Sequence, residues 1–182
     1  MSGDDATTGL AEELGISSPE ELLAHALMIE VEAEERYDLL ATQMEVHNNP
    51  ELAAIFRKLA VIEGKHAEEI RQRTVGMDIP KLSPWQYQWP DMESPEAADL
   101  SQAHYRMTPW HALQLALKAE QRAHQFFAAL ARDTADAEVR KLAEEFAEEE
   151  AEHVRLVEQL LAKHREPDPH WAEDPDPAIH QE

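Results

Sequence analysis

Four stretches of the chain carry apolar residues at steps of three or four positions, and a glutamate interrupts each stretch near its middle. Such steps place residues on one face of an α-helix, so each stretch predicts an amphipathic helix with a carboxylate on its apolar face. The glutamates are Glu30, Glu63, Glu120 and Glu150. Because apolar faces pack inside a folded protein, a fold built from these helices must bury four acidic side chains.

Capping signals indicate where the four helices begin and end. Ser18-Pro19 and Thr108-Pro109 each combine a cap residue with a proline that suits the first helical turn. Asn48-Asn49-Pro50 separates the first two helices, and residues 133–136 separate the last two. The pattern predicts helices over about 18–47, 50–73, 108–132 and 137–165.

A long connection, residues 74–107, separates the two helical pairs and contains four prolines. A connection of this length lets the second and third helices run parallel, whereas an up-down-up-down bundle needs only a short loop. We therefore predict an all-α fold, a ferritin-like four-helix bundle of two helical hairpins joined by a long crossover. The bundle spans 18–165, after an N-terminal extension (1–17) and before a proline-rich acidic tail (166–182). Aromatic residues in the crossover favour packing against the bundle, with a disordered linker as the alternative: Trp85, Tyr87 and Trp89.

Composition excludes several classes of partner and chemistry. The formal net charge of −22 would repel nucleic acids and anionic membrane surfaces. The absence of cysteine excludes thiolate zinc sites, iron–sulfur clusters and thiol catalysis. The chain has no apolar run long enough to span a membrane and no apolar segment typical of a signal peptide at its start. We expect a cytoplasmic protein that binds neither nucleic acid nor membrane.

The buried carboxylates predict a site for two metal ions. All four lie at similar depths from their helix starts and therefore near one level of the bundle. Four desolvated, mutually repelling carboxylates need compensation, and the apolar stripes offer no lysine or arginine. Two divalent cations would balance the charge, and the histidines at i+3 from Glu63 and Glu150 would add neutral ligands. The predicted metal ligands are Glu30, Glu63, His66, Glu120, Glu150 and His153. Glu-x-x-His pairs are no more frequent here than chance allows, so the prediction rests on the shared depth.

The halves of the chain also repeat one another. The first helix of each pair contains Glu-x-x-Ala followed by an aromatic residue, in Glu30/Ala33/Tyr37 and Glu120/Ala123/Phe127, and the second contains Glu-x-x-His. In this repeated pattern, over about residues 20–165, the chain resembles the ferritin-like superfamily, and most closely rubrerythrin-like di-iron carboxylate proteins without a rubredoxin domain. The resemblance implies that Glu30 and Glu120 are terminal ligands, that Glu63 and Glu150 bridge the metals, and that each histidine completes one metal.

Two departures from rubrerythrins proper refine this expectation. Ala123 stands where they carry a further glutamate, which implies a six-ligand centre, and the missing cysteines imply an external electron donor. Oxygen and nitrogen ligands suit two iron ions, with manganese or a mixed pair as alternatives. The resemblance implies an enzyme, a homodimeric oxidoreductase with peroxidase or ferroxidase activity toward peroxide or dioxygen. A di-iron monooxygenase acting on an organic substrate, and a non-catalytic metal-binding module, are the alternatives.

For other residues near the predicted site, the sequence gives weaker evidence of a functional role. Tyr37 is a candidate catalytic residue, as a hydrogen-bond partner of a ligand or a redox-active side chain, with a packing role in the core as the alternative. Glu34 and His124 follow Glu30 and Glu120 by four positions; we favour surface positions over roles in orienting ligands or holding a third ion. Three glutamates off the apolar stripes are predicted to be solvated: Glu69, Glu148 and Glu149.

Overall fold

The computed structural model describes residues 10–82 and 107–168, and in this part of the chain every regular element is a helix. A short helix, α1 (Leu10–Glu13), precedes four long ones. These are α2 (Pro19–Val46), α3 (Pro50–Arg73), α4 (Pro109–Asp133) and α5 (Ala137–Leu161). The predicted packing of the crossover aromatics and the tail beyond residue 168 lie outside the described residues, and the division into extension, bundle and tail stays a prediction.

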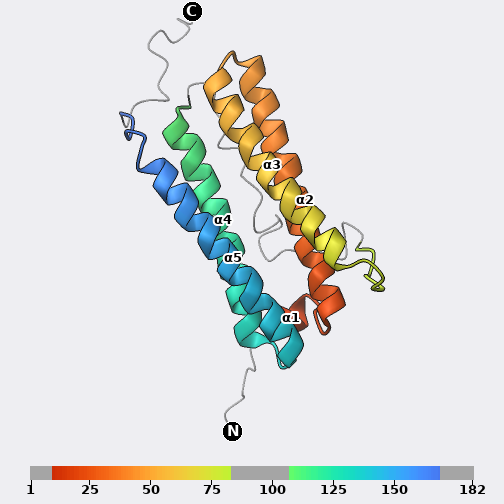
Figure 1. Ribbon diagram of the computed structural model, residues 1–182. Helices are drawn as coiled ribbons and strands as arrows, with labels where there is room; N and C mark the ends of the chain where they lie inside the picture. The colour runs from red at the N-terminus through yellow and green to blue at the C-terminus, as the bar shows by residue number, and fades with distance from the viewer. Residues whose placement is uncertain (1–9, 83–106, 169–182) are drawn as a thin grey trace, which may run out of the picture.

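The four long helices pack as two antiparallel hairpins, α2 with α3 and α4 with α5 (Figure 1). The hairpins meet where α2 contacts α5 and where α3 contacts α4. Figure 1 shows α3 and α4 running in the same direction, as expected when a long connection joins them. The predicted all-α bundle of two helical hairpins is confirmed. None of the helices in the described ranges combines the length and apolar composition needed to cross a bilayer.

Local signals explain the helix ends. Ser18 accepts a hydrogen bond from the Glu21 amide at 3.2 Å, and Asp136 accepts bonds from the first turn of α5. Asn48 closes α2 with a left-handed φ of 54°, a conformation that asparagine tolerates well. The prediction for the last helix was too long: α5 ends at Leu161, where i→i+3 bonds such as His164 N to Leu161 O tighten the chain into a turn.

The helix α1 was not predicted from the sequence, because one helical turn is too short to show a periodic pattern. Gly15, with φ of 67°, reverses the chain after this turn, and the Ile16 amide bonds back to the Ala11 carbonyl. Ala11 and Ile16 are buried, and α1 packs against α4. The segment before α2 therefore covers one end of the bundle core.

Within residues 10–82 and 107–168, the buried apolar side chains form two clusters rather than one continuous core. The first cluster includes Ile29, Phe127 and Phe146. The second includes Tyr37, Phe56 and Leu113. Along each long helix, the predicted glutamate lies between residues of one cluster and residues of the other. The bundle is therefore divided by a polar layer at mid-height, with apolar packing on both sides.

The Asn49 side chain connects the two hairpins at the end of the bundle where α3 and α4 begin. Its side chain caps α3 by accepting from the Leu52 amide at 3.3 Å, and it donates to the Met107 carbonyl at 3.2 Å. Asn49→Ala loses both bonds and should lower the free energy of unfolding by about 2 kcal/mol. Ser18→Ala, a matched variant that loses only a cap, should cost about 1 kcal/mol. Urea denaturation measures both; equal losses would mean that the bond to Met107 does not stabilise the fold.

Candidate metal centre

The polar layer brings all six predicted metal-binding side chains together from four helices. The carboxylates are almost completely buried, with exposed fractions of 3% for Glu30 and 1% for each of Glu63, Glu120 and Glu150. His66 and His153 come from α3 and α5, and their rings stack with centroids 4.5 Å apart and an interplanar angle of 8°. The two histidines therefore contact each other within the layer, one from α3 and the other from α5.

The two halves of the layer have matching geometry. His66 Nδ1 lies 3.6 Å from Glu30 Oε2 and 3.4 Å from Glu63 Oε2. In the second hairpin, His153 Nδ1 lies 3.4 Å from Glu120 Oε2 and 3.3 Å from Glu150 Oε2. Each hairpin thus supplies two carboxylates and one imidazole. This arrangement follows from the repeat in the sequence, because equivalent residues occupy equivalent places on equivalent helices.

One buried atom in each of the six side chains lacks a hydrogen-bond partner. These atoms are Oε2 of Glu30, Glu63, Glu120 and Glu150, and Nδ1 of His66 and His153. Native proteins rarely leave buried polar atoms unsatisfied, because each loses its hydration without replacement. Two groups have ligand atoms within 4.8 Å of one another, Glu63 with His66 and His153, and Glu120 with Glu150 and His153. The cluster therefore has the donor chemistry, charge and spacing to hold a pair of metal ions.

Burial makes ionisation of the carboxyl groups unfavourable. It is the main cause that raises the pKa of Glu30 and of Glu150 to about 7, partly offset by the nearby histidines and reinforced by the other carboxylates. The same causes raise the pKa of Glu120. Without a metal ion, the layer therefore retains protons that exposed carboxyl groups would lose.

For the two histidines, the nearby carboxylates outweigh burial and raise the pKa values. Burial alone would lower the pKa of His66, but the carboxylates of Glu30 and Glu63 outweigh burial and raise the pKa to about 10. Glu120 and Glu150 likewise overcome burial and raise the pKa of His153 to about 11. In the metal-free protein the imidazoles are thus the cations that compensate the carboxylates. A metal ion must displace their protons to bind.

Tyr37 lies in the apolar cluster on one side of the layer. Its side chain is fully buried, and its ring stacks on Phe56 with centroids 6.3 Å apart. This packing accounts for its place in the sequence pattern, and its catalytic role stays a prediction.

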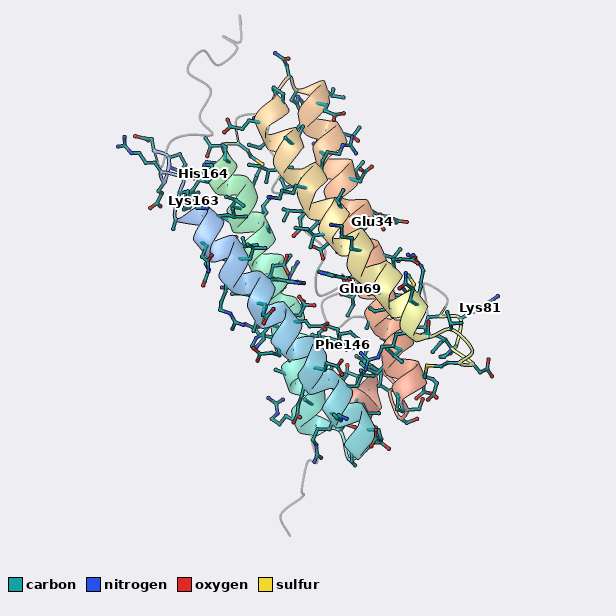
Figure 2. The ribbon with its side chains drawn as sticks, in the orientation of Figure 1. Glu34, Glu69, Lys81, Phe146, Lys163 and His164 are labelled. Carbon is teal, nitrogen blue, oxygen red and sulfur yellow. The ribbon has the colours of Figure 1, made fainter. Side chains whose placement is uncertain are left out.

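Glu34 and His124, which follow the glutamates of α2 and α4 by one turn, are both half-buried. Glu34 packs over Gly64 of α3, so close that a Cβ at position 64 would lie 2.6 Å from Glu34 Oε1. Figure 2 shows Glu34 on the α2–α3 hairpin. His124 lines a groove between α4 and α5 together with Arg132 and Arg140. These positions fit packing at the edge of the bundle, and metal-binding roles for the two residues stay untested.

An opening that was not predicted from the sequence leads to the polar layer. A cavity of about 250 Å³ lies between α3 and α5, and its lining includes Glu30, His66 and His153. Glu69 and Glu149 are exposed, in line with their predicted solvation, but they also line this cavity. A signal was present: Glu69 follows His66 by three positions and Glu149 precedes His153 by four, which places each pair on one helix face.

The fold and the converging side chains define a class of protein. Two helices contribute a lone glutamate and two contribute Glu-x-x-His, all facing the centre of the bundle, as in ferritin-like carboxylate proteins that bind two metals. The profile of the rubrerythrin family matches residues 21–98, which include α3 and nearly all of α2. The chain belongs to the rubrerythrin family, and this membership indicates binding of iron or another pair of metal ions.

A solved structure supports the same relationship over most of the chain. The crystal structure of an uncharacterized conserved protein from Magnetospirillum magnetotacticum MS-1 is 41% identical in sequence, with a TM-score of 0.63. The similarity covers 83% of this chain and 98% of that protein. Among curated proteins, none matches the chain. The comparisons therefore establish the family without naming an activity.

The raised pKa values predict how metal-free stability depends on pH. Glu30 and Glu150 have pKa values of about 7 when folded against 4.5 when exposed, so the folded protein holds more protons between pH 4.5 and 7. The histidines, raised from 6.5 to about 10 and 11, extend this difference to higher pH. We expect the free energy of unfolding of the metal-free protein to fall as pH rises from about 5 to 9.

Chemical denaturation at a series of pH values measures this trend. The variant Glu30→Gln/Glu150→Gln should flatten the part of the slope between pH 4.5 and 7, because two of the groups that retain protons are gone. Stability that increases from pH 5 to 7 in the unmodified, metal-free protein would contradict the electrostatic account.

Gly64 offers a test of Glu34. Replacing a mid-helix glycine by alanine should stabilise α3 by about 0.5–1 kcal/mol. The half-buried Glu34 carboxylate can move toward solvent to admit the Cβ. We expect Gly64→Ala to raise the thermal midpoint and leave metal affinity unchanged. The matched variant Glu34→Ala removes the carboxylate without adding a Cβ; loss of metal affinity in both variants would instead place Glu34 among the metal-binding groups.

Proposed function

We propose that the six side chains of the polar layer hold two iron ions, and that the protein is a di-iron oxidoreductase reacting with peroxide or dioxygen. The observation that supports this most is the set of six buried ligand atoms without hydrogen bonds that are gathered in one layer. Two divalent cations would satisfy these atoms and balance four ionised carboxylates. Imidazole together with carboxylate suits iron better than it suits magnesium or calcium, which prefer oxygen ligands alone.

Each residue has a definite role in this proposal. Glu30 and Glu120 would each hold one metal, Glu63 and Glu150 would contribute to both, and His66 and His153 would each complete one. When bound, a pair of irons supplies two electrons, the number needed to convert one peroxide and two protons into two water molecules. The protein keeps the ligands at fixed places through the two apolar clusters, which also exclude water from both sides of the layer. An external donor would restore the electrons.

The cavity between α3 and α5 favours a small, polar oxidant over an organic substrate. Its volume is about 250 Å³, and among the described residues of its lining Ile70 and Phe146 are the apolar ones. Sites for organic substrates are larger and mainly apolar. A monooxygenase acting on an apolar compound is therefore the weaker candidate.

Anaerobic titration with Fe(II), followed by oxidation, tests the proposal. We expect two Fe(II) per chain, both oxidised by one equivalent of peroxide. A peroxidase would keep its iron and accept electrons again from a donor, whereas a ferroxidase would release or mineralise Fe(III). Glu63→Ala and Glu150→Ala should lose the binding of at least one iron, whereas the exposed control Glu148→Gln should not. A chain that binds no iron, or binds two that react with neither oxidant, would contradict the proposal.

A further inference from the structure

The cavity between α3 and α5 connects the outside of the bundle with the polar layer. Figure 2 shows Glu69 on α3 and Phe146 on α5, on the two sides of this opening. At its inner end the cavity is lined by Glu30, whose side chain is 4% exposed and whose Oε2 has no hydrogen-bond partner. The edges of His66 and His153, which are 25% and 17% exposed, line it as well. A solute in this cavity therefore meets three of the proposed ligands.

The outer part of the opening is negatively charged. Glu69, Glu149 and Glu152 line it, and all three are exposed. Among the described residues of the lining, the one arginine is Arg73, which makes a bidentate ion pair with Glu145 of α5, with N–O distances of 2.9 and 3.1 Å. This pair ties α3 to α5 beside the opening and neutralises the arginine. The nearest cation described for Glu152 is Arg155 at 3.9 Å, which also pairs with Glu148 at 3.3 Å.

We propose that divalent metal ions enter the site through this opening, drawn in by the carboxylates of Glu69, Glu149 and Glu152. The inference rests on the proposed metal site and adds the route by which that site is filled. A cleft lined by charges of one sign between low-dielectric walls concentrates ions of the opposite sign and raises their association rate. The same charge repels anionic chelates and anionic substrates, while dioxygen and neutral peroxide pass freely. The three glutamates act on entry and do not hold the metals in their final places.

A pair of variants on α5 tests this route. Glu149→Gln/Glu152→Gln removes two charges from the opening. Glu144→Gln/Glu148→Gln removes two from the same helix, but these residues line the groove between α4 and α5 instead. Both variants change the net charge equally, so a difference between them reports position rather than total charge. Anaerobic stopped-flow mixing with Co(II), a redox-inactive probe followed by its absorption, measures entry without any oxidation chemistry.

We expect Glu149→Gln/Glu152→Gln to slow Co(II) binding about 5-fold at low ionic strength and less than about 2-fold in 0.5 M salt, where screening suppresses steering. The final occupancy should stay at two Co(II) per chain. Glu144→Gln/Glu148→Gln should bind Co(II) at nearly the unmodified rate. Arg73→Gln, which leaves the Glu145 carboxylate unpaired beside the opening, should speed binding at low salt.

Equal slowing in the two double variants, or slowing in neither, would overturn the proposed route while leaving the metal site intact. Failure of the unmodified chain to bind Co(II) would overturn the metal site and, with it, the route. The two proposals therefore fail through different measurements.

Discussion

The structure depends on the compensation of four carboxylates buried at one level of a helical bundle. These groups are 97–99% buried, and the ion-pair partners described for all four of them are histidines of the same layer. Without a metal ion, protons on the carboxyls and imidazoles must reduce the repulsion. In the proposed metal-bound state, two divalent ions would satisfy the same atoms. The layer is therefore a cost to stability without metal and, in this proposal, the metal site.

The duplicated hairpin explains how a chain of this size builds such a layer. Each hairpin contributes the same three groups, and His66 stacks on His153 where the two halves meet. A parallel arrangement of α3 and α4 brings the matching residues of both hairpins to one height. The apolar clusters on either side then fix the positions of the six side chains through packing. The geometry of the layer thus depends on the whole bundle.

Much of this arrangement could be predicted from the sequence, because a charged residue on an apolar helical stripe has few physical explanations. The helix bounds and the convergence of Glu30, Glu63, Glu120 and Glu150 follow from periodicity and capping. The helix α1 is too short to show periodicity, and the end of α5 depends on weak local preferences after Leu161. The opening was not predicted, because the sequence does not show which helix lies beside exposed glutamates such as Glu69. The electron donor and the role of Tyr37 involve interactions that neither periodicity nor packing specifies.

Anomalous diffraction from crystals grown with Fe(II) or Mn(II) tests the central claim most directly. The account predicts two peaks about 3.5–4 Å apart inside the polar layer, one bonded to His66 and the other to His153. Glu63 and Glu150 should lie between the two peaks. A chain with metal bound only at exposed acidic residues, or with a single metal outside the layer, would contradict the account.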